Sequence, residues 1–294
     1  MLCNLCPRKC NIDRSKALGF CGETEIMRVA RIAPHFFEEP VISGTRGSGT
    51  VFFSGCSMGC IFCQNRDISR RGGIGSPISA DELYEKMLEL ADMGVHNINL
   101  VTATHFLNQL IPVLQKAKAK NELKIPFVYN SSGYENIDSL KRLDGLIDIY
   151  LPDLKYFSEE LAIKYSSAPN YRETATKAIS EMIRQRGTYR YNENDPSLLQ
   201  SGVVVRHLVL PSHRKDSIDV LNELARTVDP NNILLSLMSQ YTPDFALDTS
   251  YKNLHRKVTS FEYNSVCDVA LTLGFDGFMQ DKNSAVSDYT PNFK

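Results

Sequence analysis

The sequence predicts an α/β fold built on a parallel sheet, and three observations support this prediction. Six short runs rich in Val, Ile, Leu or Phe alternate along the chain with amphipathic segments of helical periodicity. The runs are largely apolar on both faces, which is typical of parallel strands covered by helices. The chain has 294 residues, enough for one (β/α) barrel-like domain or two ordinary domains. Such alternation indicates neighbouring parallel strands joined by right-handed crossovers.

The expected elements follow one another in a regular order. Strands are expected at 50–54, 97–102, 126–130, 147–151, 203–210 and 233–239. Helices are expected where apolar residues recur every three or four positions, from the N-cap Ser79 to Gly94 and at 107–117, 171–186, 218–228 and 261–273. The polar stretch 191–197 predicts a long loop before the fifth strand. Six strands alone do not distinguish an open doubly wound sheet from a partial barrel.

Three cysteines follow the first expected strand with the spacing Cys-x3-Cys-x2-Cys, at Cys56, Cys60 and Cys63. An iron–sulfur cube is normally held by four thiolates, so three leave one iron open to a ligand that is not protein. Gly55 and Gly59 would let the backbone wrap closely around such a cluster. A zinc site would need a fourth ligand, and none lies nearby in the sequence. A disulfide would leave an odd thiol, and chance spacing is the remaining alternative.

Composition narrows the classes of function. The 33 Lys and Arg residues balance 34 Asp and Glu residues for a formal charge of −1, so the whole chain carries no nucleic-acid footprint. The sequence contains no secretory leader and no uncharged apolar run of 18 residues. We therefore expect a cytoplasmic protein with no membrane partner. The balanced charge argues against a nucleic-acid partner, with a local basic patch at 66–71 or 184–186 as the alternative. Eight cysteines in a reducing compartment favour metal or redox chemistry over structural disulfides.

The chain resembles the radical S-adenosylmethionine (SAM) family related to pyruvate formate-lyase activating enzyme. It is most similar to an uncharacterised branch with a cysteine-rich N-terminus. The motifs that carry the resemblance are Cys6-Pro7-Arg8-Lys9-Cys10, Gly19-Phe20-Cys21-Gly22, Glu38-Glu39-Pro40, the stretch 43–49, and Cys56 to Cys63 followed by Gln64-Asn65. The resemblance implies a partial (β/α)6 TIM-like barrel with this cysteine loop after its first strand. It also divides the chain into a cysteine-rich metal-binding segment, 1–48, and a barrel domain, 49–294.

The resemblance further implies a [4Fe–4S] cluster on the three loop cysteines and SAM bound beside it. Phe62 matches the position that packs against adenine. The Gly-Gly-Glu-like segment that binds the SAM amino group is replaced here by residues 102–105, which leaves Thr102 and Thr104 as the expected contacts. The remaining expected cofactor contacts, at the carboxyl ends of later strands, are Asn130, Ser132, Asp153, Lys155 and Arg206. A rim salt bridge is the alternative interpretation of Asp153 and Lys155.

No catalytic side chain is assigned by this reasoning. Isolated histidines are usually structural or solvated, so His35, His105, His207 and His213 are only candidates for the substrate side, with His105 the first choice. Cys267 lies at apolar spacing on a helix and is expected to be an ordinary buried residue.

The N-terminal segment carries its own set of cysteines, Cys3, Cys6, Cys10 and Cys21. Four soft ligands within nineteen residues can close a tetrahedral zinc site or hold an auxiliary iron–sulfur cluster. Metal-free thiols are the third alternative. Since so short a segment cannot build its own core, a bound metal would be what folds it.

The expected function is therefore that of a radical SAM enzyme, which cleaves SAM reductively to methionine and a 5′-deoxyadenosyl radical. The resemblance implies a flavodoxin or ferredoxin as electron donor and a backbone glycine of a partner glycyl radical enzyme as substrate. A radical enzyme that modifies a small molecule or RNA, and a non-catalytic iron–sulfur scaffold, are the alternatives.

Overall fold

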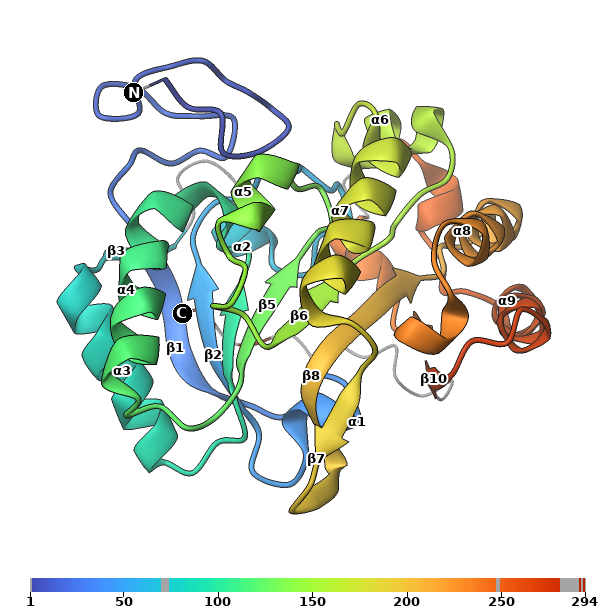
Figure 1. Cartoon of the computed structure of the whole chain (residues 1–294). Helices are drawn as coiled ribbons and strands as arrows, with labels where there is room; N and C mark the ends of the chain where they lie inside the picture. Colours follow the sequence, from blue (N-terminus) through green and yellow to red (C-terminus); the bar gives the residue numbers. More distant parts are fainter. Residues whose placement is uncertain (1, 70–73, 247–248, 281–290, 292, 294) are drawn as a thin grey trace.

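The computed structural model describes residues 2–69, 74–246, 249–280, 291 and 293. Its centre is a ten-stranded sheet in the order β10-β9-β8-β6-β5-β4-β2-β1-β3, with β7 paired to β8 (Figure 1). The strands are β1 (Arg28–His35), β2 (Ser48–Phe53), β3 (Ser76–Pro77), β4 (Ile98–Val101), β5 (Phe127–Ser131), β6 (Ile149–Pro152), β7 (Arg190–Asn192), β8 (Asp195–Leu208), β9 (Leu234–Met238) and β10 (Gly277–Met279).

Seven of these strands form one parallel series in chain order, from β2 through β4, β5, β6, β8 and β9 to β10. A doubly wound sheet reverses its strand order in the middle, whereas this series never reverses, as in a barrel. Between β3 and β10, the two ends of the sheet, no pairing occurs among the described residues, so the barrel is incomplete. The partial-barrel fold class predicted from the sequence is confirmed.

The helices cover the outside of the curved sheet (Figure 1). The longer ones are α3 (Ala80–Asp92), α4 (Leu107–Lys120), α6 (Glu159–Ser166), α7 (Tyr171–Arg186), α8 (Arg214–Thr227) and α9 (Ser260–Thr272). Shorter ones are α1 (Pro40–Ser43), α2 (Arg66–Ser69) and α5 (Ile137–Lys141). The five helices predicted from periodicity are all present, and Ser79 caps α3 in a capping box with Glu82.

The two faces of the strands have different tasks. On β8, Val203 and Val205 point outward into the main core between sheet and helices, while Val204 points inward. Inward residues of β5, β6, β8 and β9 pack against Val41 and Ile42 of α1, forming an apolar floor across one end of the barrel. One step further along the strands the inward residues Asn130, Arg206 and Ser236 are polar, so a polar band follows the apolar floor before Leu208 and Met238 at the ends of β8 and β9.

Three strands differ from the expectation. The stretch 191–197 is not a long loop but belongs to a hairpin, in which β7 pairs antiparallel with the start of β8. β1 lies within the predicted segment 1–48, yet it is hydrogen-bonded antiparallel to β2 over residues 29–35. The boundary at residue 48 stays a prediction. β10 adds a seventh parallel strand of three residues, too short to stand out as an apolar run.

Residues 2–27, here called the head, have mostly irregular backbone and lie against α5. Asn136 donates its amide to the carbonyl of Asn4 at 2.9 Å, and the Ser139 hydroxyl donates to the carbonyl of Leu5 at 2.7 Å. Elsewhere, none of the described helices combines the length and apolar character needed to cross a membrane.

Candidate active site

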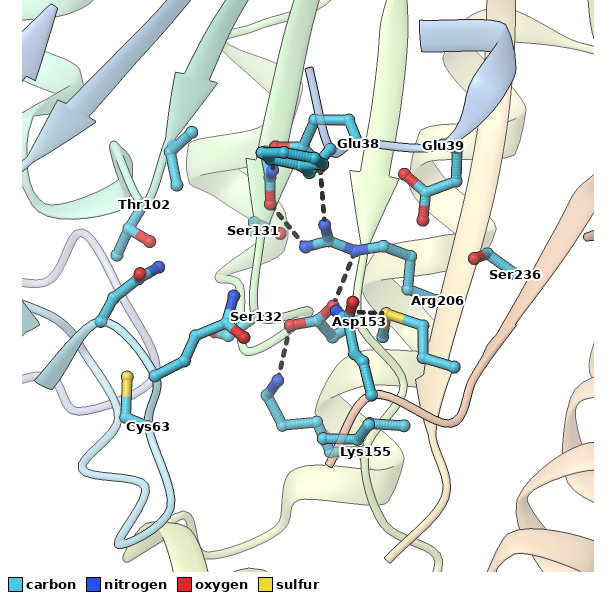
Figure 2. Close-up of a pocket in the computed structure, with 18 of the residues that line it drawn as sticks. Glu38, Glu39, Cys63, Thr102, Ser131, Ser132, Asp153, Lys155, Arg206 and Ser236 are labelled. Atoms are coloured by element: carbon cyan, nitrogen blue, oxygen red, sulfur yellow. Dashed lines mark hydrogen bonds and ion pairs between the residues drawn. The ribbon is translucent and has the colours of Figure 1, made fainter. Parts of the chain in front are cut away.

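A cavity opens at the carboxyl ends of the parallel strands, above the apolar floor (Figure 2). It encloses about 1390 Å³ of space, part of it continuous with the solvent. Its wall combines the strand ends, the cysteine loop after β2 and the turn before α1. Parallel barrels build their active sites on this face.

The three loop cysteines all line this cavity. Hydrogen-bond donors from different elements reach their sulfurs: the Ser166 hydroxyl lies 2.9 Å from Cys60 Sγ, and the Ser69 hydroxyl lies 3.5 Å from Cys63 Sγ. Burial raises the pKa values of Cys56 and Cys63, and the neighbouring Cys60 adds to both shifts. The thiols therefore need a positive partner, such as a metal, to ionise.

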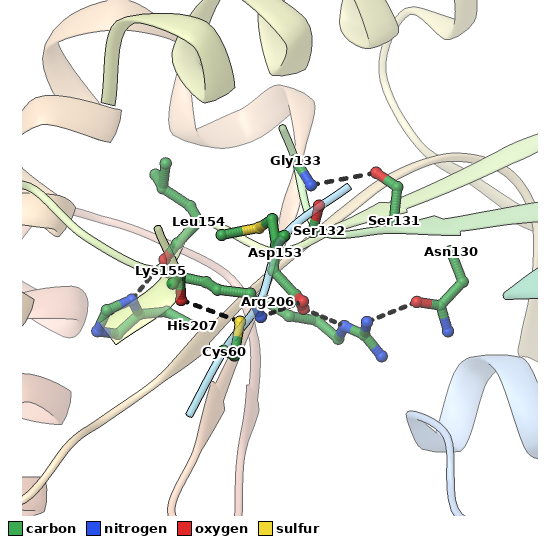
Figure 3. Close-up of polar contacts among 12 residues, drawn as sticks. Cys60, Asn130, Ser131, Ser132, Gly133, Asp153, Leu154, Lys155, Arg206 and His207 are labelled. Atoms are coloured by element: carbon green, nitrogen blue, oxygen red, sulfur yellow. Dashed lines mark hydrogen bonds and ion pairs between the residues drawn. The ribbon is translucent and has the colours of Figure 1, made fainter. Parts of the chain in front are cut away.

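A cationic side chain stands beside these sulfurs. Burial opposes the charge of Lys155, but Asp153 and Cys60 together hold its pKa above the ordinary range. Lys155 Nζ lies 2.5 Å from Asp153 Oδ2 (Figure 3). The two side chains are only 19% and 13% exposed, so this pair is not the rim salt bridge that the sequence left open.

Asp153 is the junction of a longer polar chain across the barrel interior (Figure 3). Arg206 Nε donates to Asp153 Oδ1 at 2.9 Å, and its two terminal nitrogens donate to Glu38 Oε2 at 3.2 Å and Asn130 Oδ1 at 2.6 Å. Burial would raise the pKa of Asp153, but Arg206 and Lys155 hold it below its usual range. Since every side chain in this hydrogen-bonded series has a partner, the series forms a preorganised polar wall of the cavity.

Two carboxylates come from the turn before α1. Glu38 Oε1 accepts from the amides of Asn99 at 3.1 Å and Asn130 at 3.2 Å, which completes its hydrogen bonding. Glu39 is 8% exposed, and its Oε2 has no hydrogen-bond partner among the described residues. Burial raises the pKa values of both carboxyls, partly opposed by Arg206.

The donor set fits a cluster with one open corner. The cavity holds three thiols with donors to their sulfurs, a buried cation beside them and room for a further ligand. None of the residues lining the cavity supplies a fourth thiol. This is the arrangement that an incompletely ligated iron–sulfur cube requires.

The comparison with protein families agrees with this arrangement. The Radical SAM superfamily matches residues 50–224, from the first parallel strand to α8. The chain belongs to the radical SAM superfamily. Membership implies a [4Fe–4S] cluster and SAM as cofactors, and an enzyme rather than a scaffold.

Relatives extend the similarity over most of the chain. An uncharacterized protein of Methanocaldococcus jannaschii is 26% identical over 284 residues, which cover 93% of this chain and 75% of that protein. Streptococcus suis SuiB bound to S-adenosylmethionine shares 11% identity with a TM-score of 0.52, over 77% of this chain and 48% of SuiB. HydG, a maturase of the [FeFe]-hydrogenase, shares 13% identity with a TM-score of 0.51, over 76% of this chain and 48% of HydG. These two structures show a shared fold, and the chain spans about half the length of each.

Most of the predicted SAM contacts of this radical SAM protein line the cavity. Phe62, Thr102, Asn130, Ser132, Asp153, Lys155 and Arg206 all do so. The Phe62 ring meets Tyr241 edge-on, with ring centroids 5.9 Å apart. Thr104 does not line the cavity, because its hydroxyl donates to the buried carboxylate of Glu135 at 2.7 Å.

The histidines are mostly structural. His105, the first choice from the sequence, is buried outside the cavity with Nε2 2.6 Å from the carbonyl oxygen of Ser54. His207 similarly contacts the carbonyl of Leu154, at 2.6 Å, and His213 lies 2.9 Å from the Tyr165 hydroxyl. Among the four candidates only His35 lines the cavity.

The sequence reasoning missed Glu39 and Ser236 as cavity residues. The only sequence signal for Glu39 was its place in the Glu38-Glu39-Pro40 motif. Because Glu39 lies in a turn, no helical or strand periodicity predicts that its side chain points into the cavity. Ser236 is an inward position in the middle of β9, where a single polar residue in an apolar strand was the available signal.

The head cysteines lie outside the cavity. In the part of the chain that the structure describes, no three Cys, His, Asp or Glu side chains form a ready site for one metal ion, so zinc or a second cluster there stays a prediction. The head nevertheless contacts the cysteine loop directly. The Cys56 amide donates to the carbonyl of Cys21 at 3.2 Å, and Arg8 Nε donates to the carbonyl of Ser57 at 2.7 Å.

Proposed function

We propose that this protein is a radical SAM enzyme whose cluster is held by Cys56, Cys60 and Cys63. When bound, the cluster and SAM supply an electron and a 5′-deoxyadenosyl radical that abstracts a hydrogen atom from a substrate. The observation that carries the proposal is the meeting of three cysteine thiols with a buried lysine in one cavity at the carboxyl ends of the strands.

The residues of the chain would divide the work of binding. Lys155 offsets part of the negative charge that three thiolates bring into a buried site. Asp153 and Arg206 offer a fixed pair of opposite charges suited to the amino-acid part and sugar of SAM, and Phe62 offers an aromatic face for adenine. Because Asp153 and Arg206 are already held by their neighbours, little ordering would be needed when SAM binds.

We further propose that the substrate is a backbone glycine of a partner enzyme, and that a cytoplasmic flavodoxin or ferredoxin supplies the electron. The first part rests on the resemblance to the activating-enzyme family. Its physical support is Phe37, an aromatic side chain of the cavity lining that is 50% exposed. An exposed apolar side chain at a cavity suits a protein surface that covers it.

The test is anaerobic reconstitution of the cluster, followed by addition of SAM and dithionite. We expect 5′-deoxyadenosine and methionine in equal amounts from the wild type and none from Cys60→Ala. A reconstituted protein that binds SAM but yields no 5′-deoxyadenosine would be a scaffold. Addition of a glycyl radical enzyme should then give a glycine-centred radical by electron paramagnetic resonance, and its absence would refute the partner assignment alone.

A further inference from the structure

Glu39 is the one charged side chain of the cavity that the polar network leaves unused. The two cations that line the cavity, Arg206 and Lys155, are engaged by Asp153 and Glu38. No ion pair joins Glu39 to any basic group within the described residues, although its carboxylate is near Ser236. The cavity therefore carries one carboxylate more than its own cations neutralise.

The fold does not explain the direction of this side chain. Glu39 occupies the N-cap position of α1, yet its side chain makes no capping hydrogen bond. Instead it turns into the cavity, and 92% of its surface is covered because it is only 8% exposed. The carboxylate interacts with the Ser236 hydroxyl and is attracted by Arg206, but its Oε2 has no hydrogen-bond partner among the described residues. Leaving a buried oxygen of this kind unpaired is costly, and a ligand that donates to Oε2 would remove that cost.

Glu39 and Cys63 lie on opposite sides of the Arg206–Asp153 pair in Figure 2. Of the expected cofactor contacts, Arg206 is the one whose charge acts on Glu39. We take the cofactor to occupy the cysteine side of this pair, which leaves the Glu39 side for another ligand. Three of the five N–H groups of Arg206 serve Asp153, Glu38 and Asn130. An ionised Glu39 can only accept, so a ligand that binds this carboxylate must bring its own donors.

We propose that Glu39, assisted by Ser236, binds a cationic group of the substrate, an ammonium or a guanidinium. This inference rests on the proposed function, because it takes the rest of the cavity as the site of SAM. A cation would pair with Oε2 and neutralise the excess carboxylate in a site largely shielded from water, where a charge-assisted hydrogen bond is strong. The group is either a free amine or the side chain of a lysine or arginine in a peptide.

The test measures binding rather than turnover. Reconstituted protein saturated with SAM is titrated with n-butylammonium, n-butylguanidinium and the uncharged 1-pentanol by calorimetry. We expect at least one cation to bind tenfold or more tightly to the wild type than to Glu39→Gln, with pentanol unchanged, and a smaller loss in Ser236→Ala. The exposed Glu25→Gln is the matched control and should bind as the wild type does. Equal cation binding by wild type and Glu39→Gln would overturn the proposal.

Two further arms distinguish the source of the cation and the dependence on the proposed function. Acetyl-Gly-Lys-amide that binds more tightly than both butylammonium and acetyl-Gly-norleucine-amide indicates a peptide, whereas butylammonium that binds more tightly than the lysine peptide indicates a free amine. SAM affinity should be the same in Glu39→Gln and wild type, and the melting temperature should be no lower, which excludes misfolding. If cation binding depends on Glu39 but no 5′-deoxyadenosine forms, the radical function fails while this site stands.

Discussion

The two sets of cysteines in this chain are built on different principles. The loop cysteines line a cavity whose walls are strand ends, and donors from α2 and from α6 point at their sulfurs. The head cysteines lie on irregular backbone, where Cys10 accepts from the nearby Phe20 amide and Cys21 contacts the carbonyl of Glu23. Strand ends and helices of the barrel thus position the first set, whereas the second set lies on turns that contact the barrel and the loop, as at Cys21, whose carbonyl accepts from the Cys56 amide.

Burial acts on both sets in the same direction. It raises the pKa of Cys6 to about 12 and raises that of Cys21, as it does for Cys56 and Cys63 in the loop. A cation opposes the shift in both sets, because Lys155 acts on Cys56 and Cys63 and the buried Arg14 acts on Cys21. The two sets therefore differ in the structure around the thiols, a cavity for the loop and irregular backbone for the head.

The largest expected effect is that of Cys60→Ala. Removing one of three thiolates leaves the cube without enough protein ligands, so the variant should lose the reducible cluster completely. Iron and sulfide analysis with electron paramagnetic resonance on the dithionite-reduced protein measures this. Cys267→Ala, a buried cysteine on α9, is the control and should keep the cluster. A reducible cluster in Cys60→Ala would remove the basis of the comparison.

Cys6→Ala should have a narrower effect. If the head holds its own metal, this variant loses zinc or a second paramagnetic signal and keeps the loop cluster. Anaerobic metal analysis of wild type, Cys6→Ala and Cys60→Ala side by side makes the measurement. Unchanged metal content in Cys6→Ala would show that the head thiols bind no metal.

We expect protonation of His105 to make the stability of the folded protein depend on pH, because this residue contacts both the loop and the head. It contacts the carbonyl of Ser54, just before the loop, and its own carbonyl accepts from Arg14 of the head. Burial lowers its pKa from 6.5 to about 4. The folded state therefore resists protonation, so stability present above pH 6.5 is lost as the pH falls toward 4.

Urea unfolding at pH 7 and pH 5 measures this loss, as the difference between wild type and His105→Gln. We expect the wild type to lose about 2 kcal/mol more than the variant between these pH values. The comparison with the variant is needed because burial raises the pKa of Glu135 to about 7. Protonation of Glu135 therefore stabilises the folded protein as the pH falls over the same range, in both the wild type and the variant. Parallel losses in the two proteins would contradict the assignment.

The smallest expected effect is that of Arg8→Gln, which removes the side-chain bond from head to loop at Ser57. The loop should still bind its cluster, but we expect the cluster to be lost a few-fold faster to a chelator, in line with one lost charge-assisted hydrogen bond of about 1.5–3 kcal/mol, partly replaced by water. The exposed Lys9→Gln should match the wild type. Equal rates would mean that the Arg8 side chain does not support the loop.

Much of this arrangement follows from sequence patterns. The strand runs predicted the parallel series because strands buried on both faces are apolar throughout. Asn130, Asp153 and Arg206 could be expected to meet because carboxyl ends of parallel strands share one edge. In this part of the fold, local periodicity and global packing agree.

The missing parts lie where the chain leaves regular structure. After β4 the backbone turns at Thr102, with φ of +61°, into a short 3-10 turn, Thr104–Phe106, that carries Thr104 and His105 behind the sheet. β1 escaped notice because, as an antiparallel strand near the sheet edge, it carries Arg28 and Arg31 among its apolar residues. The spacing of apolar residues encodes neither the turn after β4 nor the pairing of β1.

At Gly55 the cysteine loop packs directly against the head, with no room for a side chain between them. The φ of Gly55 is +82°, and a β-carbon there would lie 2.7 Å from the carbonyl oxygen of Cys21 and 2.5 Å from Cγ of Glu23. Residues more than thirty positions apart thus occupy one space, and neither side can grow unless the other retreats. Because a φ of +82° also disfavours every other residue, we expect glycine at this place in related chains whether or not they keep the N-terminal head.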